Sequence, residues 1–182
     1  CQPGIDTEWN IHRITDTDYP AIIRCFVKTK FFHFPLYKEL NAKSNFMIPF
    51  KDITLADKDT ITSFTMKSER RNCDLSFSNL CSWRFLYDTQ FAVVDNFLVF
   101  KFWAGEQLAY MMPVGTGDLK AVLWELIEDA RKENQHFCML GVCSNMRADL
   151  EAILPEQFTF TEDRDYADYI YLRSDLSKLK GK

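Results

Sequence analysis

The chain has 182 residues, of which 47% are apolar, so it can form one domain of ordinary size whose core needs no disulfide bonds. Its net charge of −4 and its lack of a basic run exclude general binding of polyanions through the whole surface. No apolar run reaches the roughly 18 residues of a membrane span, and the six cysteines and three histidines lack metal-site spacing, so we expect a cytoplasmic protein with no metal and with small, buried, reduced cysteines.

Residues 1–46 show no clear helical or strand period. From Met47 onward, turn-forming and helix-capping residues separate the predicted elements. We interpret residues 1–46 as an upstream extension that the domain does not need for folding. The alternative is an N-terminal arm that packs on the domain. The domain itself is predicted to cover residues 47–176.

The domain is predicted to begin with one short strand and two helices. Residues 50–53 are the strand candidate. Thr54 and Asp57 have the spacing of a capping box, which predicts a helix from there to about Glu69. A second, short helix is predicted over residues 76–85 because several apolar residues recur in it.

Three strands are predicted to follow as a meander, over residues 90–95, 97–103 and 107–112. Asp95 and Asn96 tolerate positive φ angles, so they predict a tight hairpin turn between the first two strands. Pro113 cannot donate a ladder hydrogen bond and should end the third strand.

A long helix is predicted over residues 118–134, because its apolar residues fall on one stripe. The stripe consists of Leu119, Val122, Leu123, Leu126, Ile127 and Ala130. Charged residues, among them Glu128 and Asp129, are expected to form the solvated side of this helix.

The last predicted elements are a buried central strand, one helix and two closing strands. The strand covers residues 137–142, and the helix runs from Ser144 to Pro155. Residues 158–161 and 166–172 are the closing strands. A meander that feeds a β-α-β crossover predicts an α/β (α+β) fold, with a mixed, mostly antiparallel sheet and helices on both faces.

The connection before the long helix is the most specific local signal for binding. Gly115, Thr116, Gly117 and Asp118 are the ligand-binding candidates, because glycines before a helix start let backbone N–H groups approach a phosphate or carboxylate. The alternative is a plain strand-to-helix turn in which Asp118 is the N-cap and repels a phosphate.

A second candidate cluster lies in the last predicted strand and combines phenols with charges. Its members are Arg164, Asp165, Tyr166, Asp168, Tyr169 and Tyr171. Such a surface suits a cationic substrate or a partner domain. The alternative is an edge strand whose charges prevent aggregation. No spacing suggests a nucleophile with its base, so the catalytic residues are unknown.

The element order and the strand–G-x-G–helix connection resemble the GNAT-like acyltransferase fold, whose R/Q-x-x-G-x-G/A motif holds the pyrophosphate of coenzyme A. Here Met112 stands where the motif begins with Arg or Gln, and both glycines are kept. More specifically, residues 47–51, 73–80, 113–118 and 163–171 resemble the phosphatidylglycerol lysyltransferase C-terminal-domain family.

The resemblance implies a bacterial protein with two GNAT-like domains in tandem. Residues 47–182 resemble the first domain, residues 177–182 resemble the start of a linker, and a second domain is expected after Lys182. The implied donor of the full-length protein is an acyl-CoA or an aminoacyl-tRNA, and this half alone is expected to be inactive. The alternatives are a free-standing acyl-CoA-dependent N-acetyltransferase and a non-catalytic GNAT-like binding module.

Overall fold

The computed structural model describes residues 22–27, 47–68, 70, 72–163 and 177. Its strands are β1 (Ile22–Val27), β2 (Lys51–Asp52), β3 (Gln90–Val94), β4 (Phe97–Ala104), β5 (Gln107–Met111), β6 (Val114–Gly115), β7 (Cys138–Val142) and β8 (Phe158–Asp163). Its helices are α2 (Lys58–Thr65), α3 (Phe77–Tyr87), α4 (Leu119–Lys132) and α5 (Ser144–Ile153), and short 3-10 turns cover Leu55–Asp57 and Cys73–Leu75.

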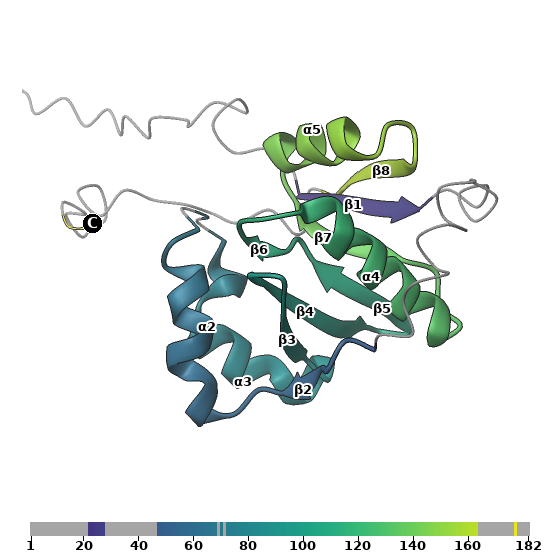
Figure 1. The fold of residues 1–182 in the computed structure, drawn as a ribbon. Coiled ribbons are helices and arrows are strands. Elements are labelled where there is room, and N and C mark those ends of the chain that lie inside the picture. The colour runs from purple at the N-terminus through teal and green to yellow at the C-terminus, as the bar shows by residue number, and fades with distance from the viewer. Residues whose placement is uncertain (1–21, 28–46, 69, 71, 164–176, 178–182) are drawn as a thin grey trace, which may run out of the picture.

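The described strands form one mixed sheet in the order β2-β3-β4-β5-β7-β1-β8, with β6 attached to β4 (Figure 1). Only the β5–β7 pairing is parallel among them, because α4 carries the chain across the sheet between these two strands. The other pairings are antiparallel. The predicted fold class is therefore confirmed, including the meander and the β-α-β crossover through α4; α5 makes a second crossover, from β7 past β1 to β8.

Two hydrophobic clusters show that helices cover both faces of the sheet. The first cluster packs α4 and α5 against the sheet, with Leu123, Leu126 and Leu150 fully buried. The second packs α2 and α3 against the other face, around Ile61 and Phe100. Burial of large apolar side chains on both faces is what fixes this three-layer arrangement.

The β3–β4 hairpin has the tight turn that the sequence predicts. Asp95 and Asn96 have φ angles of 44° and 63°, which is the pattern of a two-residue turn with both central residues left-handed. The register across the hairpin pairs Val94 with Phe97. This turn matters for the candidate site, because the connection before α4 packs on it.

Strand β1 lies within residues 1–46, and the sequence did not predict it. It pairs antiparallel with β7 on one side and with β8 on the other, and Cys25 is fully buried between them. In the structure, Ile22–Val27 therefore packs as the N-terminal arm of the alternative interpretation would. Whether residues 47–176 fold without this strand stays a prediction.

The described cysteines are free thiols, and their burial varies. Cys25, Cys81 and Cys138 are buried as expected, but Cys143 is half-buried and Cys73 is exposed, so the expectation of burial is wrong for these two residues. Cys73 belongs to a short 3-10 turn whose buried side chain is that of Leu75. Burial raises the pKa of Cys25, to which the neighbouring Cys138 adds, and burial raises the pKa of Cys138 to about 11.

The start of the first helical segment depends on one carboxylate. Asp57 accepts hydrogen bonds from the backbone N–H and the hydroxyl of Thr54, at 2.9 and 2.6 Å, and from the Lys51 ammonium at 2.6 Å. The predicted reciprocal arm of the capping box is confirmed, although the Thr54 hydroxyl donates to this carboxylate. The hydrogen bond from Lys51, followed by those from Thr54, lowers the pKa of Asp57 to about 2.

Asp57→Asn should reduce the free energy of unfolding at pH 7 by about 1 kcal/mol, the usual cost of losing a helix-start cap. The folded-state pKa lies below the ordinary value of 3.8, so this contribution is present above pH 4 and is lost as the pH falls towards 2. Urea titrations between pH 7 and pH 2 measure the convergence of the two proteins. Asp59→Asn is the control, since its carboxylate is exposed in the same segment; a constant gap between Asp57→Asn and the parent at every pH would contradict the prediction.

Candidate functional site

The glycine connection before α4 packs directly on the β3–β4 hairpin. β6 pairs with the start of β4, with Gly115 opposite Phe97. A Cβ atom at Gly115 would lie 2.1 Å from the backbone oxygen of Asn96, a distance that no side chain tolerates. Gly115 is therefore required by the close approach of two backbones, whatever else this loop does.

Gly117 and Asp118 complete the turn into the helix. Gly117 has a φ of +145°, a conformation that side chains with a Cβ rarely adopt. The Asp118 carboxylate accepts a hydrogen bond from the Ala121 N–H at 3.1 Å and so is the N-cap of α4. These contacts give the loop a structural role, and ligand binding by Gly115, Thr116, Gly117 and Asp118 stays a prediction.

The surroundings of this loop are acidic. Burial raises the pKa of Glu125, and the carboxylate of Asp95 in the adjacent hairpin turn adds to the shift. Together with Asp118, these carboxylates oppose the approach of a phosphate. Met112, at the position where the coenzyme A motif begins with Arg or Gln, has its side chain buried in the core. The loop thus has no cationic side chain at the position where the coenzyme A motif begins, and carboxylates lie nearby.

The carboxyl ends of the parallel strands β5 and β7 are the second candidate site, which we call the β5–β7 strand-end site. Their register pairs Tyr110 with Met139 and Met111 with Leu140, where β5 ends. Pro113, two residues later, cannot donate to a neighbouring strand, as predicted. The backbone groups beyond this point need other partners.

Arg70 supplies those partners. Its guanidinium donates to the carbonyl oxygen of Met112 at 2.7 Å and to that of Pro113 at 2.6 Å. Burial lowers the pKa of Arg70, and the neighbouring Cys143 and Asp149 act in the opposite direction, so a guanidinium stays charged here. Sequence reasoning missed Arg70, because nothing in its local pattern marks a bond to residues 42 and 43 positions away.

The rest of the β5–β7 strand-end site comes from β7 and the residues that follow it. Gly141 has a φ of +71°, and a Cβ atom there would lie 3.6 Å from the Asn72 side-chain nitrogen. Cys143 directly precedes α5, and its carbonyl oxygen accepts from the Arg147 N–H. The β5–β7 strand-end site therefore combines a half-buried cation, an amide side chain and a helix start, and these groups suit a polar substrate group.

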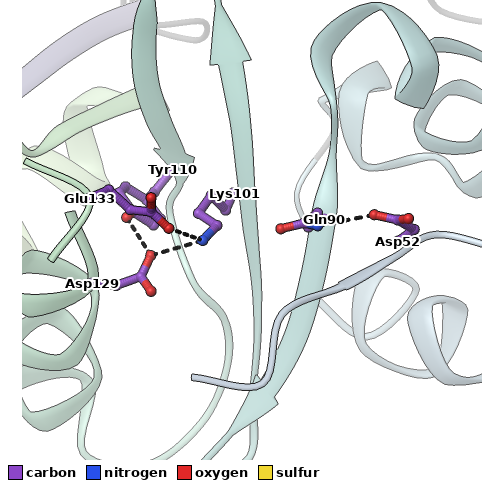
Figure 2. Close-up of polar contacts among 6 residues, drawn as sticks. All are labelled: Asp52, Gln90, Lys101, Tyr110, Asp129 and Glu133. Atoms are coloured by element: carbon purple, nitrogen blue, oxygen red, sulfur yellow. Dashed lines mark hydrogen bonds and ion pairs between the residues drawn. The ribbon is translucent and has the colours of Figure 1, made fainter. Parts of the chain in front are cut away.

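A third polar cluster joins α4 to the sheet (Figure 2). The Lys101 ammonium lies 3.3 Å from the Asp129 carboxylate and 3.4 Å from that of Glu133. The buried Tyr110 hydroxyl donates to Asp129 at 2.7 Å, and Lys101 lies 4.5 Å from the centre of the Phe50 ring. Burial, and then the charge of Asp129, raise the pKa of Tyr110, so the phenol stays protonated and donates.

The charged side of α4 is therefore less solvated than the sequence predicts. Glu128 is buried, and its carboxylate binds the Arg131 guanidinium. Asp129 faces the sheet through Tyr110 and Lys101. The predicted apolar stripe is confirmed, but the expectation of a solvated opposite side is wrong for these two carboxylates, because partners reach them from the sheet and the next turn.

Several sequence predictions fall on other parts of the chain. The candidates Arg164, Asp165, Tyr166, Asp168, Tyr169 and Tyr171 lie outside the described residues. Within the described part, no group of three or more His, Cys, Asp or Glu side chains is arranged to hold a metal ion. No helix among the described residues is long and apolar enough to cross a membrane.

Comparisons with known proteins place this fold in a family context. A family model described as "Phosphatidylglycerol lysyltransferase, C-terminal" matches residues 65–182. The chain is also similar to a solved structure, described as a conserved protein of unknown function from Bacteroides thetaiotaomicron VPI-5482, with 88% identity and a TM-score of 0.71. That match covers 75% of this chain and 46% of that chain, so the chain spans less than half of this relative. No curated protein matches the chain.

Proposed function

Because the chain belongs to the phosphatidylglycerol lysyltransferase C-terminal family, we propose that it forms one half of a tandem GNAT-like transferase that moves an aminoacyl or acyl group. The family match over residues 65–182 carries the proposal. The length of the relative supports the division into halves, since this chain corresponds to 46% of it. The second half is a further GNAT-like domain, and this half is inactive by itself.

Aminoacyl-tRNA is the donor that we favour, and the charge of the chain indicates which half binds it. A surface that holds RNA needs clustered Lys and Arg side chains, because it must neutralise phosphates. This chain has a net charge of −4 and no basic run. The main RNA-binding surface therefore belongs to the remainder of the longer protein, and this half contributes one wall of the reaction channel.

The β5–β7 strand-end site is the proposed contribution of this half to the channel. In the transfer, an acceptor oxygen or nitrogen attacks the ester carbonyl of the donor, and the bond from that carbon to the ribose oxygen breaks. The acceptor proton passes to the leaving ribose oxygen. A fixed cation such as Arg70, near the developing charge, stabilises such a transition state. Arg70 is the residue of this site best suited to this role.

The alternative is a free-standing acyl-CoA-dependent N-acetyltransferase, and the observed loop geometry disfavours it. Met112 is in the core, Asp118 caps α4, and Asp95 and Glu125 add negative charge nearby. A coenzyme A pyrophosphate would meet carboxylates where it needs cations. A third candidate is a non-catalytic binding module, since one fold can serve both catalytic and binding functions.

The test compares this chain with the longer relative in two assays. Bulk tRNA charged with radiolabelled amino acids is mixed with phosphatidylglycerol vesicles, and the label is followed from RNA into the lipid extract. We expect transfer by the longer protein and none by this chain. Transfer by this chain alone, or no transfer by either, would overturn the tandem aminoacyltransferase. Calorimetry with acetyl-CoA is the second assay: micromolar binding to this chain would favour the N-acetyltransferase.

A further inference from the structure

The last part of α3 carries a group of apolar side chains that the described residues leave exposed. The group consists of Trp83, Phe85, Leu86 and Tyr87, which are 52%, 76%, 64% and 40% exposed. We call these four residues the α3 surface. They account for half of the large hydrophobic side chains that are exposed in the described part of the chain. The others, such as Leu55 and Met66, do not share one element with each other.

The sequence of α3 explains this exposed group. Leu80 and Cys81 are buried, so the helix already has a core-facing side. On the solvent side, Ser78 and Ser82 are polar, and the exposed apolar residues follow them towards the end of the helix. The α3 surface is therefore the part of the helix on which a second layer can pack.

Ring contacts and a neighbouring hollow give the α3 surface a defined shape. The rings of Trp83 and Tyr87 lie one turn apart with their centres separated by 6.5 Å, and the Arg84 guanidinium lies 3.9 Å from the centre of the Phe85 ring. Leu86 and Tyr87 border an open hollow of about 430 Å³, whose other walls are Asp88, Trp103 and Gly105. Aromatic side chains beside a hollow are the usual composition of an interaction hot spot.

We propose that the α3 surface docks the half of the longer protein that this chain does not contain, with an apolar side chain of that half in the hollow beside Trp103. The inference rests on the tandem arrangement proposed above. More than half of the relative lies outside the match, and that portion needs a surface on the shared half. A covalently attached partner has a high effective concentration, so a small apolar centre is enough to hold it.

The charges of the segment favour a protein over RNA or a lipid surface. Arg84 is the sole cation of α3, and Asp88 follows the helix directly. Surfaces that bind nucleic acid are strongly basic. Helices that lie on membranes carry several Lys or Arg residues on the polar face. Neither pattern is present in α3.

The first test is hydroxyl-radical footprinting of this chain and of the longer relative, read by mass spectrometry of the α3 peptide. We expect α3 in the longer protein to be oxidised about tenfold more slowly, because hot-spot side chains are fully desolvated in an interface. The peptide that contains Met66, which is 82% exposed, is the internal control and should react equally in both proteins. Equal oxidation of α3 in both proteins would overturn the proposal.

A matched pair of substitutions gives the second test. Leu86→Ser should lower the melting temperature of the longer protein by several degrees and leave that of this chain unchanged. Leu55→Ser, at a leucine that is 76% exposed outside the α3 surface, should leave both unchanged. Concentration-dependent protection of α3 in this chain alone would assign the surface to a second copy and overturn the proposal.

Neither readout depends on catalysis, so the two proposals fail separately. A protected α3 surface in a protein that transfers no aminoacyl group leaves the docking in place and overturns the function. Transfer by a protein whose α3 surface is unprotected leaves the function in place and overturns the docking.

Discussion

Gly115→Ala should reduce the free energy of unfolding by about 3 kcal/mol or more, at the upper end of overpacking effects. The new Cβ would lie 2.1 Å from the Asn96 carbonyl oxygen and 2.8 Å from the Phe97 Cα, and both atoms belong to the backbone of the β3–β4 hairpin. No rotamer change relieves such a contact. β6 or the hairpin must move, and with it the start of α4. The midpoint of a urea titration measures the loss.

Two other glycines separate the clash from backbone strain. Gly105 has a φ of +67° and open space around its missing Cβ, so Gly105→Ala should cost only about 1 kcal/mol, from strain. Gly117→Ala combines a positive φ with a contact at 3.2 Å to the Asp95 oxygen and should fall between the two. If Gly115→Ala were as mild as Gly105→Ala, the packing described for β6 would be wrong.

Lys101→Met should cost about 2 kcal/mol, because it leaves Asp129 without its cation where the side chain is 14% exposed. Fully buried pairs lose roughly 3–5 kcal/mol when one partner is removed, and the residual exposure of this pair reduces that loss. Methionine keeps most of the packing on Phe50, so the change removes chiefly the charge. Thermal and urea unfolding at pH 7 measure the loss.

A double-mutant cycle tests whether the loss comes from this pair. Lys101→Met combined with Asp129→Asn should recover about 1 kcal/mol, because the amide oxygen still accepts from Tyr110 while the unpaired charge is gone. Lys58→Met is the control at an exposed lysine and should change stability by less than about 0.5 kcal/mol. Strict additivity of the two substitutions would show that Lys101 and Asp129 do not interact in solution.

The sequence predicts elements well where a local pattern determines them. The Asp95-Asn96 turn, the stop at Pro113 and the apolar stripe of α4 each depend on residues within a few positions of one another, and each is confirmed. The mixed sheet follows from their order. The family resemblance is also confirmed, by the match over residues 65–182.

Features that depend on distant partners could not be predicted in this way. Arg70 binds carbonyl groups more than forty residues away, and Asp129 is drawn to the sheet by Tyr110 and Lys101. β1 is a strand because β7 and β8 are there to pair with it, and its six residues carry no alternating pattern of their own. For the glycine connection, the turn with Asp118 as N-cap is present, and ligand binding by these residues stays a prediction.

The rates at which the three buried thiols of the described residues are alkylated can show which parts of the protein open first. A reagent cannot reach a thiol in the core, so Cys25, Cys81 and Cys138 should resist alkylation for as long as β1, α3 and β7 stay in place. Exposed Cys73 reacts at once and sets the reference rate. If β1 and β8 can separate from β7 while the rest stays folded, the peptide that contains Cys25 will be modified well before the one that contains Cys81. If the sheet opens as one unit, the two will be modified together.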